Sequence, residues 1–306
     1  MRVLSLLPAS TEILAALGAG DSLVGVSHEC DYPPLLLYGK PRVTRSSLGA
    51  AATPLEVDLS VRARSNAGEA LYSLDETAIT SLEPDLVITQ ALCDVCAVSE
   101  DDVRAITMRL DPEPAVVTLS GSTWKGVCDD IAAIGDAIGC SDAASSLVES
   151  LDARLRVVHD RLKAARAPRP RVVVIEWTDP VFAAGHWVPE LVRRAGGTEL
   201  MAAPGDHSIV RSAEEIRAAE PELLVIAPCG YDVAGAIVAA RAMLARDEWA
   251  WARDLPVWAM DANSLLSRPG PRLVDGAETL AKILHPALFG LPDATRACRV
   301  ELGHVR

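Results

Sequence analysis

Two short segments of the chain concentrate side chains that can bind a metal or transfer protons. The segment His28-Glu29-Cys30-Asp31-Tyr32-Pro33 offers an imidazole, two carboxylates and a thiol shortly after the apolar run 23–26. The segment Cys93-Asp94-Val95-Cys96 follows a second apolar run, 85–89. Ligand-binding side chains often lie on loops at strand ends, which hold them rigidly. If both runs are strands, we expect the two segments to form one shared site. The alternative is a structural role, because free cysteines are often small buried apolar residues.

The chemistry of these segments indicates a site for zinc, iron or another borderline metal, since imidazole and thiolate are common ligands of such ions. His28, Cys93 and Cys96 are the expected metal ligands, and Glu29 directly follows the first of them. Two other interpretations stay open. The two cysteines can form a redox pair, or the segments can contact a ligand through hydrogen bonds alone. A single Cys-x-x-Cys pair is only half of the usual structural zinc motif.

Aromatic residues form a second group of candidates in the C-terminal half. Trp177 directly follows the apolar run 171–176, and His186 and Trp187 open a predicted helix soon after it. Aromatic faces give a large contact area at little entropic cost, so this group favours a large flat ligand. The two tryptophans can instead fill the core.

Ser10, Tyr231 and Arg268 are further candidates because each follows a predicted strand. Ligands of open α/β sheets bind beyond the carboxyl ends of the strands, and helix amino termini present free N–H groups to anions. Ser10 lies at the start of the first predicted helix, so it either faces a ligand or only caps that helix. His207 lies in a Gly-Asp-His-Ser loop and has no assigned role.

No common catalytic motif stands in the sequence. A Gly-x-Ser-x-Gly elbow, a phosphate-binding loop and a dinucleotide fingerprint are all absent, which disfavours hydrolase, kinase and dehydrogenase functions.

The pattern of apolar runs predicts an α/β fold with mainly parallel strands. Short runs rich in Val, Ile and Leu alternate with helical patterns, as expected of a sheet that helices cover on both faces. The predicted strands are 3–7, 23–26, 85–89, 115–119, 171–176, 222–227 and 256–260. Helix starts are expected at Ser10, Asp75, Ser99 and Ser212, the last with a capping box to Glu215.

Residues 141–167 contain no Gly or Pro and predict one long amphipathic helix. Its apolar positions recur at intervals of three and four: Leu147, Leu151, Leu155, Val158 and Leu162. We therefore expect an N-terminal α/β lobe at 1–140, a connecting helix at 141–167 and a C-terminal α/β lobe at 168–306. A helical connector is stiff, so the lobes should rock only slightly about a cleft.

Composition excludes several partners. The net charge of −13 and the pI near 4.9 argue against nucleic acid and against an anionic membrane surface as partners.

The sequence also bears on the location of the protein. The first apolar run stops at Pro8, short of a signal-peptide core, and no segment is long enough for a membrane helix. The seven cysteines, an odd number, favour free thiols or metal ligands over a disulfide framework. We expect a cytoplasmic protein.

Several motifs resemble one family, the solute-binding proteins of iron-siderophore and cobalamin ABC importers. The similarity covers about residues 3–287. The motifs are Leu6-Leu7-Pro8-Ala9-Ser10-Thr11-Glu12-Ile13, Val24-Gly25-Val26-Ser27, Leu82-Glu83-Pro84-Asp85-Leu86-Val87-Ile88, Val192-Arg193-Arg194-Ala195-Gly196-Gly197 and Glu220-Pro221-Glu222-Leu223-Leu224-Val225-Ile226. The resemblance implies the class III solute-binding-protein fold, in which a long spanning helix joins two Rossmann-like lobes and a ligand binds between them.

Within that family, the chain is similar to the subgroup called cobalamin-binding proteins, in which segments like 28–33, 93–99, 185–187 and 267–272 occur together. This similarity implies binding of a corrinoid or another metal-bearing small molecule between the lobes, without catalysis. The expected ligand-binding residues are Ser10, His28, Glu29, Cys93, Cys96, Trp177, His186, Trp187, Tyr231 and Arg268. The alternative is a cytoplasmic metal-dependent enzyme that uses His28, Glu29, Cys93 and Cys96. Docking on a membrane permease is disfavoured, because the importer relatives dock from outside the cell.

Overall fold

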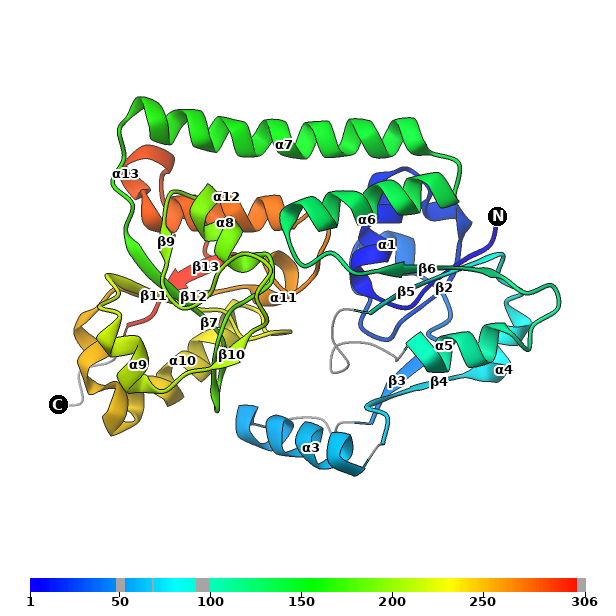
Figure 1. The fold of residues 1–306 in the computed structure, drawn as a ribbon, viewed down its shortest axis with the longest axis horizontal. Coiled ribbons are helices and arrows are strands. Elements are labelled where there is room, and N and C mark those ends of the chain that lie inside the picture. Colours follow the sequence, from blue (N-terminus) through cyan, green and yellow to red (C-terminus); the bar gives the residue numbers. More distant parts are fainter. Residues whose placement is uncertain (48–52, 68, 92–99, 302–306) are drawn as a thin grey trace. The chain divides into compact units, whose positions relative to one another are not determined.

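The computed structural model describes residues 1–47, 53–67, 69–91 and 100–301, and the chain divides into two compact units (Figure 1). The first unit comprises Met1–Gly121 and Lys125–Ser150, and the second comprises Ser122–Trp124 and Leu151–Arg306. Each unit is an α/β structure with its own sheet.

The first unit is built on a four-stranded parallel sheet in the order β2-β1-β5-β6. The strands are β1 (Val3–Ser5), β2 (Leu23–Val26), β5 (Leu86–Gln90) and β6 (Ala115–Leu119). The helices are α1 (Pro8–Ala16), α4 (Glu76–Ser81), α5 (Glu100–Thr107) and α6 (Trp124–Ala137). Because both faces of β1 and β5 are buried, most of their residues are apolar, as the sequence predicts. On one face, Leu4 and Val87 pack against Ile79 of α4 and Ile106 of α5.

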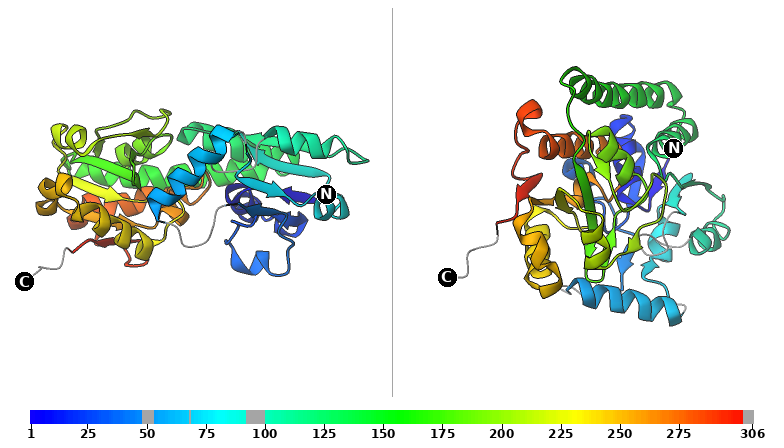
Figure 2. Two further views of the ribbon diagram at one scale, coloured as in Figure 1. Left: turned by 90° about the horizontal axis from the view of Figure 1, so that it is seen from below. Right: turned by 60° about the vertical axis from the view of Figure 1, so that its left-hand side comes forward.

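A small antiparallel ribbon extends the first unit. It pairs β3 (Thr44–Ser46) with β4 (Tyr72–Leu74), and between them lies the helix α3 (Pro54–Ala67), none of whose residues is buried. Figures 1 and 2 show α3 in light blue, away from the four-stranded sheet. The short helix α2 (Pro34–Leu37) and a 3-10 turn at Gly20–Ser22 complete this unit. None of these short elements is predicted from the sequence.

The second unit has a mixed seven-stranded sheet. Its strands are β7 (Arg171–Thr178), β8 (Val181–Ala183), β9 (Thr198–Glu199), β10 (Ile209–Val210), β11 (Leu223–Ile226), β12 (Val257–Met260) and β13 (Ala297–Arg299). The predicted strands form its parallel centre, β7-β11-β12. The unpredicted strands β8, β10 and β13 run antiparallel to their neighbours.

Helices cover both faces of this second sheet (Figure 1). They are α8 (Val188–Arg194), α9 (Ala213–Ala218), α10 (Val233–Ala245), α11 (Ala262–Leu265), α12 (Leu273–Leu284) and α13 (Pro286–Phe289), with a 3-10 segment at Asp247–Asp254. Ile175 and Ile226 pack against Ile216 of α9, Met243 of α10 and the buried Trp249. On the other face, α8 packs against α12.

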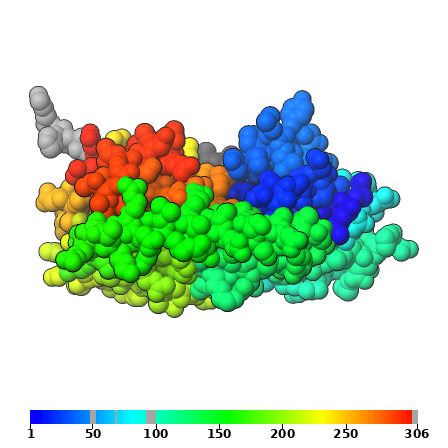
Figure 3. Space-filling model, turned by 90° about the horizontal axis from the view of Figure 1, so that it is seen from above, coloured from blue at the N-terminus to red at the C-terminus, as the bar shows by residue number. Residues whose placement is uncertain are grey.

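The long predicted helix is confirmed as α7 (Ser141–Ala164). The division between the two units falls inside it, after Ser150, whereas the lobe boundaries expected from the sequence stay a prediction. In the second unit, Arg154 of α7 donates to Glu278 of α12 at 2.7 Å, and Arg161 stacks over the ring of Phe289 at 4.8 Å. Figure 3 shows this part of α7 in green beside the orange-red α12 and α13. Among the described helices, none is both long and apolar enough to cross a membrane.

The predicted helix starts have different outcomes. Asp75 and Ser212 are confirmed as N-caps, and Ser212 forms the complete capping box with Glu215. The start at Ser10 is wrong, because α1 begins at Pro8 and its N-cap is Leu7. The fixed φ of proline suits the first helical position, where a missing N–H costs nothing. Ser99 lies outside the described residues.

Replacement of Ser212 by alanine tests the capping box. We expect the free energy of unfolding to fall by about 1 kcal/mol, because the N–H of Glu215 loses the serine hydroxyl as its acceptor, and the Glu215 carboxylate loses the hydroxyl as a donor. Thermal melting measures this loss. The control Ser150→Ala removes an exposed hydroxyl inside α7 and should leave the melting temperature nearly unchanged. Equal effects of the two substitutions would contradict the assigned role of the cap.

Candidate functional site

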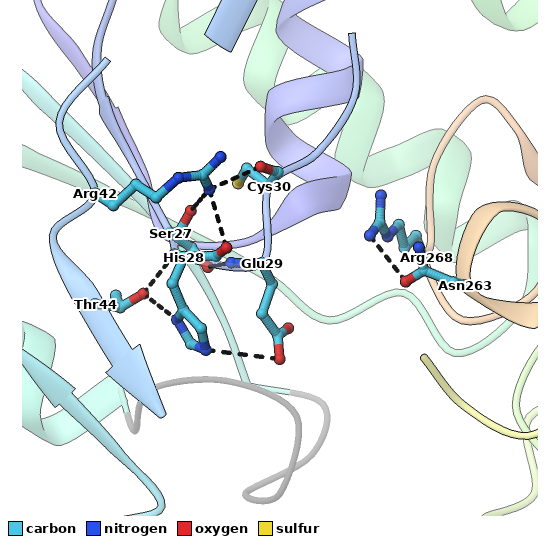
Figure 4. Close-up of polar contacts among 8 residues, drawn as sticks. All are labelled: Ser27, His28, Glu29, Cys30, Arg42, Thr44, Asn263 and Arg268. Carbon is cyan, nitrogen blue, oxygen red and sulfur yellow. Dashed lines mark hydrogen bonds and ion pairs between the residues drawn. The ribbon is translucent and has the colours of Figure 1, made fainter. Parts of the chain in front are cut away.

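The loop that contains His28 is fixed by an arginine that the sequence analysis does not single out. One guanidinium nitrogen of Arg42 lies 3.1 Å from the carbonyl oxygen of Ser27, 2.9 Å from that of His28 and 2.8 Å from that of Cys30 (Figure 4). Arg42 reaches these carbonyls because its backbone runs beside the end of β2 and pairs with Val26. A planar guanidinium directs its donors in fixed directions, so these contacts set the course of the loop.

The imidazole of His28 is held on two sides. Thr44, the first residue of β3, places its hydroxyl oxygen 2.8 Å from the backbone N of His28 and 2.6 Å from its Nδ1 (Figure 4). The ring centroid lies 5.5 Å from that of Tyr72 on β4, with the rings tilted by 43°. The ribbon β3/β4 therefore fixes the ring plane and leaves Nε2 as the imidazole nitrogen that Thr44 does not contact.

The surroundings keep the His28 ring neutral. Partial burial lowers the pKa of His28, and the cationic Arg42 lowers it further. The Nε2 atom is buried and has no hydrogen-bond partner among the described residues, and Oε1 of Glu29 lies 3.9 Å from it. A neutral imidazole is the form that binds metals.

Ser10 and Cys30 belong to a buried polar network. Sγ of Cys30 lies 3.2 Å from Oγ1 of Thr11, and the hydroxyl of Ser5 lies 2.7 Å from Thr11 Oγ1 and 2.6 Å from Ser10 Oγ. All four residues are fully buried or nearly so. The structure thus places Ser10 in the core, where its hydroxyl connects α1 to Ser5 of β1. Its expected role as a cap is wrong, because the N-cap of α1 is Leu7, and its expected contact with a ligand stays a prediction.

The proposed thiolate ligands Cys93 and Cys96 lie outside the described residues. In the part of the chain that the structure describes, no three His, Cys, Asp or Glu side chains gather so that they could hold a metal ion. A zinc or iron site that uses His28 with the two cysteines therefore stays a prediction.

A second group of candidates meets at one edge of the sheet in the second unit. Trp177 and Tyr231 pack edge to face, with ring centroids 5.8 Å apart and planes at 76°. The backbone N–H of Asn263 donates to the carbonyl of Tyr231 at 3.0 Å, and the Asn263 side-chain oxygen accepts from Arg268 at 2.9 Å (Figure 4). These residues lie at or after the ends of β7, β11 and β12, which are parallel neighbours. Their carboxyl ends consequently share an edge, where ligands of α/β sheets bind.

This group combines an aromatic pair with a buried cation. Arg268 is only 7% exposed, and Trp177 and Tyr231 are half-buried. Burial raises the pKa of the Tyr231 phenol, so that this side chain is a neutral donor at pH 7. The sequence does not identify Asn263 as a site residue, because only the fold brings its backbone N–H to Tyr231 and its side-chain oxygen to Arg268.

His186 and Trp187 follow the strand β8, which the sequence does not predict, and their expected role as ligand-binding residues stays a prediction. The unpredicted strand β8 reverses the chain, so that Ala184 pairs with Val174 in the first half of β7. Trp187 is 6% exposed and donates its indole N–H to the carbonyl of Leu266 at 2.8 Å, which ties the start of α8 to the segment before Arg268. The His186 ring instead lies 5.5 Å from that of His207.

Comparison with known sequences places the chain among binding proteins. The family described as "Periplasmic binding protein" matches residues 3–250. The chain is 25% identical, over 296 residues, to an uncharacterized ABC transporter substrate-binding lipoprotein, YvrC, of Bacillus subtilis, covering 94% of this chain and 81% of that protein. It is 22% identical, over 290 residues, to a vitamin B12-binding protein of Vibrio cholerae, covering 92% and 88%.

Solved structures agree on the fold. A periplasmic heme binding protein from Pseudomonas aeruginosa matches with a TM-score of 0.74 at 20% identity and 98% coverage of both chains. The periplasmic vitamin B12 binding protein BtuF of Vibrio cholerae matches with a TM-score of 0.64 at 23% identity, covering 94% of this chain and 97% of that one. The resemblance and the fold class inferred from the sequence are confirmed. Because the family match extends over most of the chain, this protein belongs to the periplasmic binding protein family.

Proposed function

We propose that this protein binds a corrinoid or another metal-bearing small molecule and does not catalyse a reaction. The observation that carries the proposal is the His28 imidazole. Its Nδ1 is held by Thr44, its pKa is lowered, and its Nε2 has no hydrogen-bond partner among the described residues. An imidazole in this state is a good axial ligand for the cobalt or iron of a flat macrocycle.

Thr44 supports the same role through the tautomer of His28. A hydroxyl oxygen has two lone pairs, so Thr44 can accept from both the backbone N–H and the Nδ1–H of His28. The Nε2 lone pair is then free for a metal. Metal-binding histidines usually donate their other N–H to such a second group, which orients the ring.

The second unit supplies contacts that suit the rest of such a ligand. The aromatic pair Trp177–Tyr231 offers a surface for a flat ring, and the Arg268 cation suits acidic groups at its rim. Among relatives of similar fold, one is named for vitamin B12 and others for heme, which are both tetrapyrroles with a central metal. These names support a ligand of this chemical class.

Equilibrium titration tests the proposal. Purified protein is titrated with aquocobinamide, hydroxocobalamin and hemin, while the visible bands of each probe are followed and retention is measured by dialysis. We expect at least one probe to be retained, with a spectral change that reports nitrogen coordination. Absence of retention and of spectral change for all three probes well above micromolar concentration would refute the proposal.

Replacement of Trp177 by alanine should weaken binding of the retained probe about tenfold, because an aromatic contact contributes roughly 0.5–1.5 kcal/mol beyond the area it buries. The matched variant Trp177→Phe keeps an aromatic face and should lose clearly less. Affinities from the same titration measure both effects. Equal losses in the two variants would show that the ring face does not contact the ligand.

The sequence-based prediction that one ligand contacts both lobes is tested by the same assay. If it is correct, substitutions of His28 and of Trp177 weaken binding of the same probe. If only one of them does, the ligand contacts a single unit.

A further inference from the structure

We propose that His186 and His207 form a proton-sensitive latch, which holds the loop 203–208 against Gly185 at neutral pH and releases it under mildly acidic conditions. This latch lies in the second unit and does not depend on the identity of the ligand.

Three hydrogen bonds hold the loop in place. The backbone N–H of His186 donates to the carbonyl of Asp206 at 2.6 Å, and the N–H of Gly205 donates to the carbonyl of His186 at 2.8 Å. The N–H of Gly185 donates to the hydroxyl of Ser208 at 3.1 Å. Residues 185–186 therefore both donate hydrogen bonds to the loop and accept one from it.

The backbone at the latch is tightly packed and strained. A Cβ atom at Gly185 would lie 2.4 Å from the carbonyl oxygen of Asp206 and 2.6 Å from the backbone of His207, so the loop passes directly over this glycine. His186 has a φ of +53°, in the left-handed region that a residue with a side chain seldom adopts. The hydrogen bonds of the closed loop hold His186 in this conformation.

The imidazole rings make the closed state sensitive to protons. The His186 ring is half-buried and packs edge to face on the exposed His207, with centroids 5.5 Å apart and planes at 89°. Its Nε2 is buried without a hydrogen-bond partner among the described residues. Burial lowers the pKa of His186, and the neighbouring His207 lowers it further. Protonation of His186 therefore places a cation without a hydrogen-bond partner among the described residues against the ring of His207.

The direction of the effect follows from this lowered pKa. The closed state binds the His186 proton less tightly than an open, solvated loop does. As the pH falls from about 6.5 through the lower pKa of the closed state, the closed state loses stability. Above about pH 6.5 the latch is fully effective.

The carboxylates on neighbouring elements do not neutralise His186. One carboxylate oxygen of Asp206 accepts a hydrogen bond from the N–H of Ala203, which lies 2.8 Å away in the same loop. Glu190 on α8 accepts from Arg194 at 2.8 Å and from the N–H of Trp124 at 3.1 Å. Both carboxylates are thus engaged elsewhere.

Glu199, at the end of β9, titrates in the opposite direction. It accepts from the N–H groups of Met201 and Ala202, yet burial raises its pKa to about 7. Its protonation on acidification favours the folded state. A global stability curve would therefore mix the two effects, and a local measurement is required.

Hydrogen exchange measures the stability of this loop locally. The intact protein is exchanged, and peptides that cover 203–208 are analysed by mass spectrometry. After correction for intrinsic exchange, we expect protection of these peptides to fall by up to about tenfold between pH 7.5 and pH 5.5, the most that one imidazole with an open-state pKa of 6.5 can contribute. Peptides from α10 should show no comparable change and serve as the internal control.

Two variants identify the groups responsible. His186→Asn keeps a residue type that tolerates positive φ but cannot titrate, so its loop should show the same protection at both pH values. His207→Ala removes the second ring and should reduce the difference. Unchanged protection in the wild type between the two pH values, or an undiminished loss in His186→Asn, would overturn the proposal.

Discussion

Replacement of His28 by alanine is expected to weaken binding of a cobalt- or iron-centred probe by more than about 100-fold. Loss of a group that only orients a metal ligand typically costs 10–100-fold in affinity, and loss of the ligand itself costs more. The spectral change that reports nitrogen coordination should disappear as well. The fold should persist, because His28 lies on a loop that the Arg42 guanidinium holds through backbone carbonyls and not through the ring.

A matched variant separates coordination from packing. Thr44→Val keeps the volume of a fully enclosed side chain but removes the hydroxyl beside Nδ1 of His28. We expect a loss of about 10–100-fold with the coordination spectrum retained. His159→Ala, on the exposed side of α7, should bind like the wild type. If His28→Ala retains the wild-type affinity and spectrum, His28 is not the metal ligand.

The predicted strands were found because each lies in an apolar run of at least four residues, and β1, with three residues, begins the longer apolar run 3–7. The runs 23–26 and 115–119 coincide with β2 and β6, and the run 171–176 corresponds to β7. A strand that is buried on both faces requires consecutive apolar residues, and such a run can be recognised from neighbouring positions in the sequence alone. The strands β8, β9, β10 and β13 contain only two or three residues each, too few to show a period.

The strand β8, which has only three residues, determines how the chain reaches His186 and Trp187. This strand turns the chain back along β7 before His186, and the indole N–H of Trp187 then donates to the carbonyl of Leu266. His28, Trp177 and Tyr231 could be singled out by residue type alone. Arg42, Thr44 and Asn263 could not, because their contacts join positions that are distant in the sequence or depend on the course of a loop.

Other expectations have no test in the structure. The roles of Cys93 and Cys96 concern residues outside the described part of the chain, and the cytoplasmic location stays a prediction that cell fractionation can check. Metal analysis of protein purified without added metal addresses the enzyme alternative, which requires stoichiometric zinc or iron.

Replacement of Gly185 by alanine should have a large effect on stability. The added Cβ would lie 2.4 Å from the carbonyl oxygen of Asp206 and 2.6 Å from backbone atoms of His207 and Ser208. Backbone atoms cannot rotate away as a flexible side chain can, so the loop 203–208 must move. We expect the free energy of unfolding to fall by about 2–3 kcal/mol, which corresponds to a loss of about 5–10 °C in melting temperature.

The control for this substitution is Gly290→Ala. Gly290 has a φ of +76°, but a Cβ there meets no atom within 4 Å, so alanine introduces strain without a clash and should cost only about 1 kcal/mol. The two variants are compared by thermal melting and by hydrogen exchange of 203–208 at pH 7.5. Gly185→Ala should expose the loop already at this pH, whereas Gly290→Ala should not. Full protection of the loop in Gly185→Ala would contradict the close packing on which the latch depends.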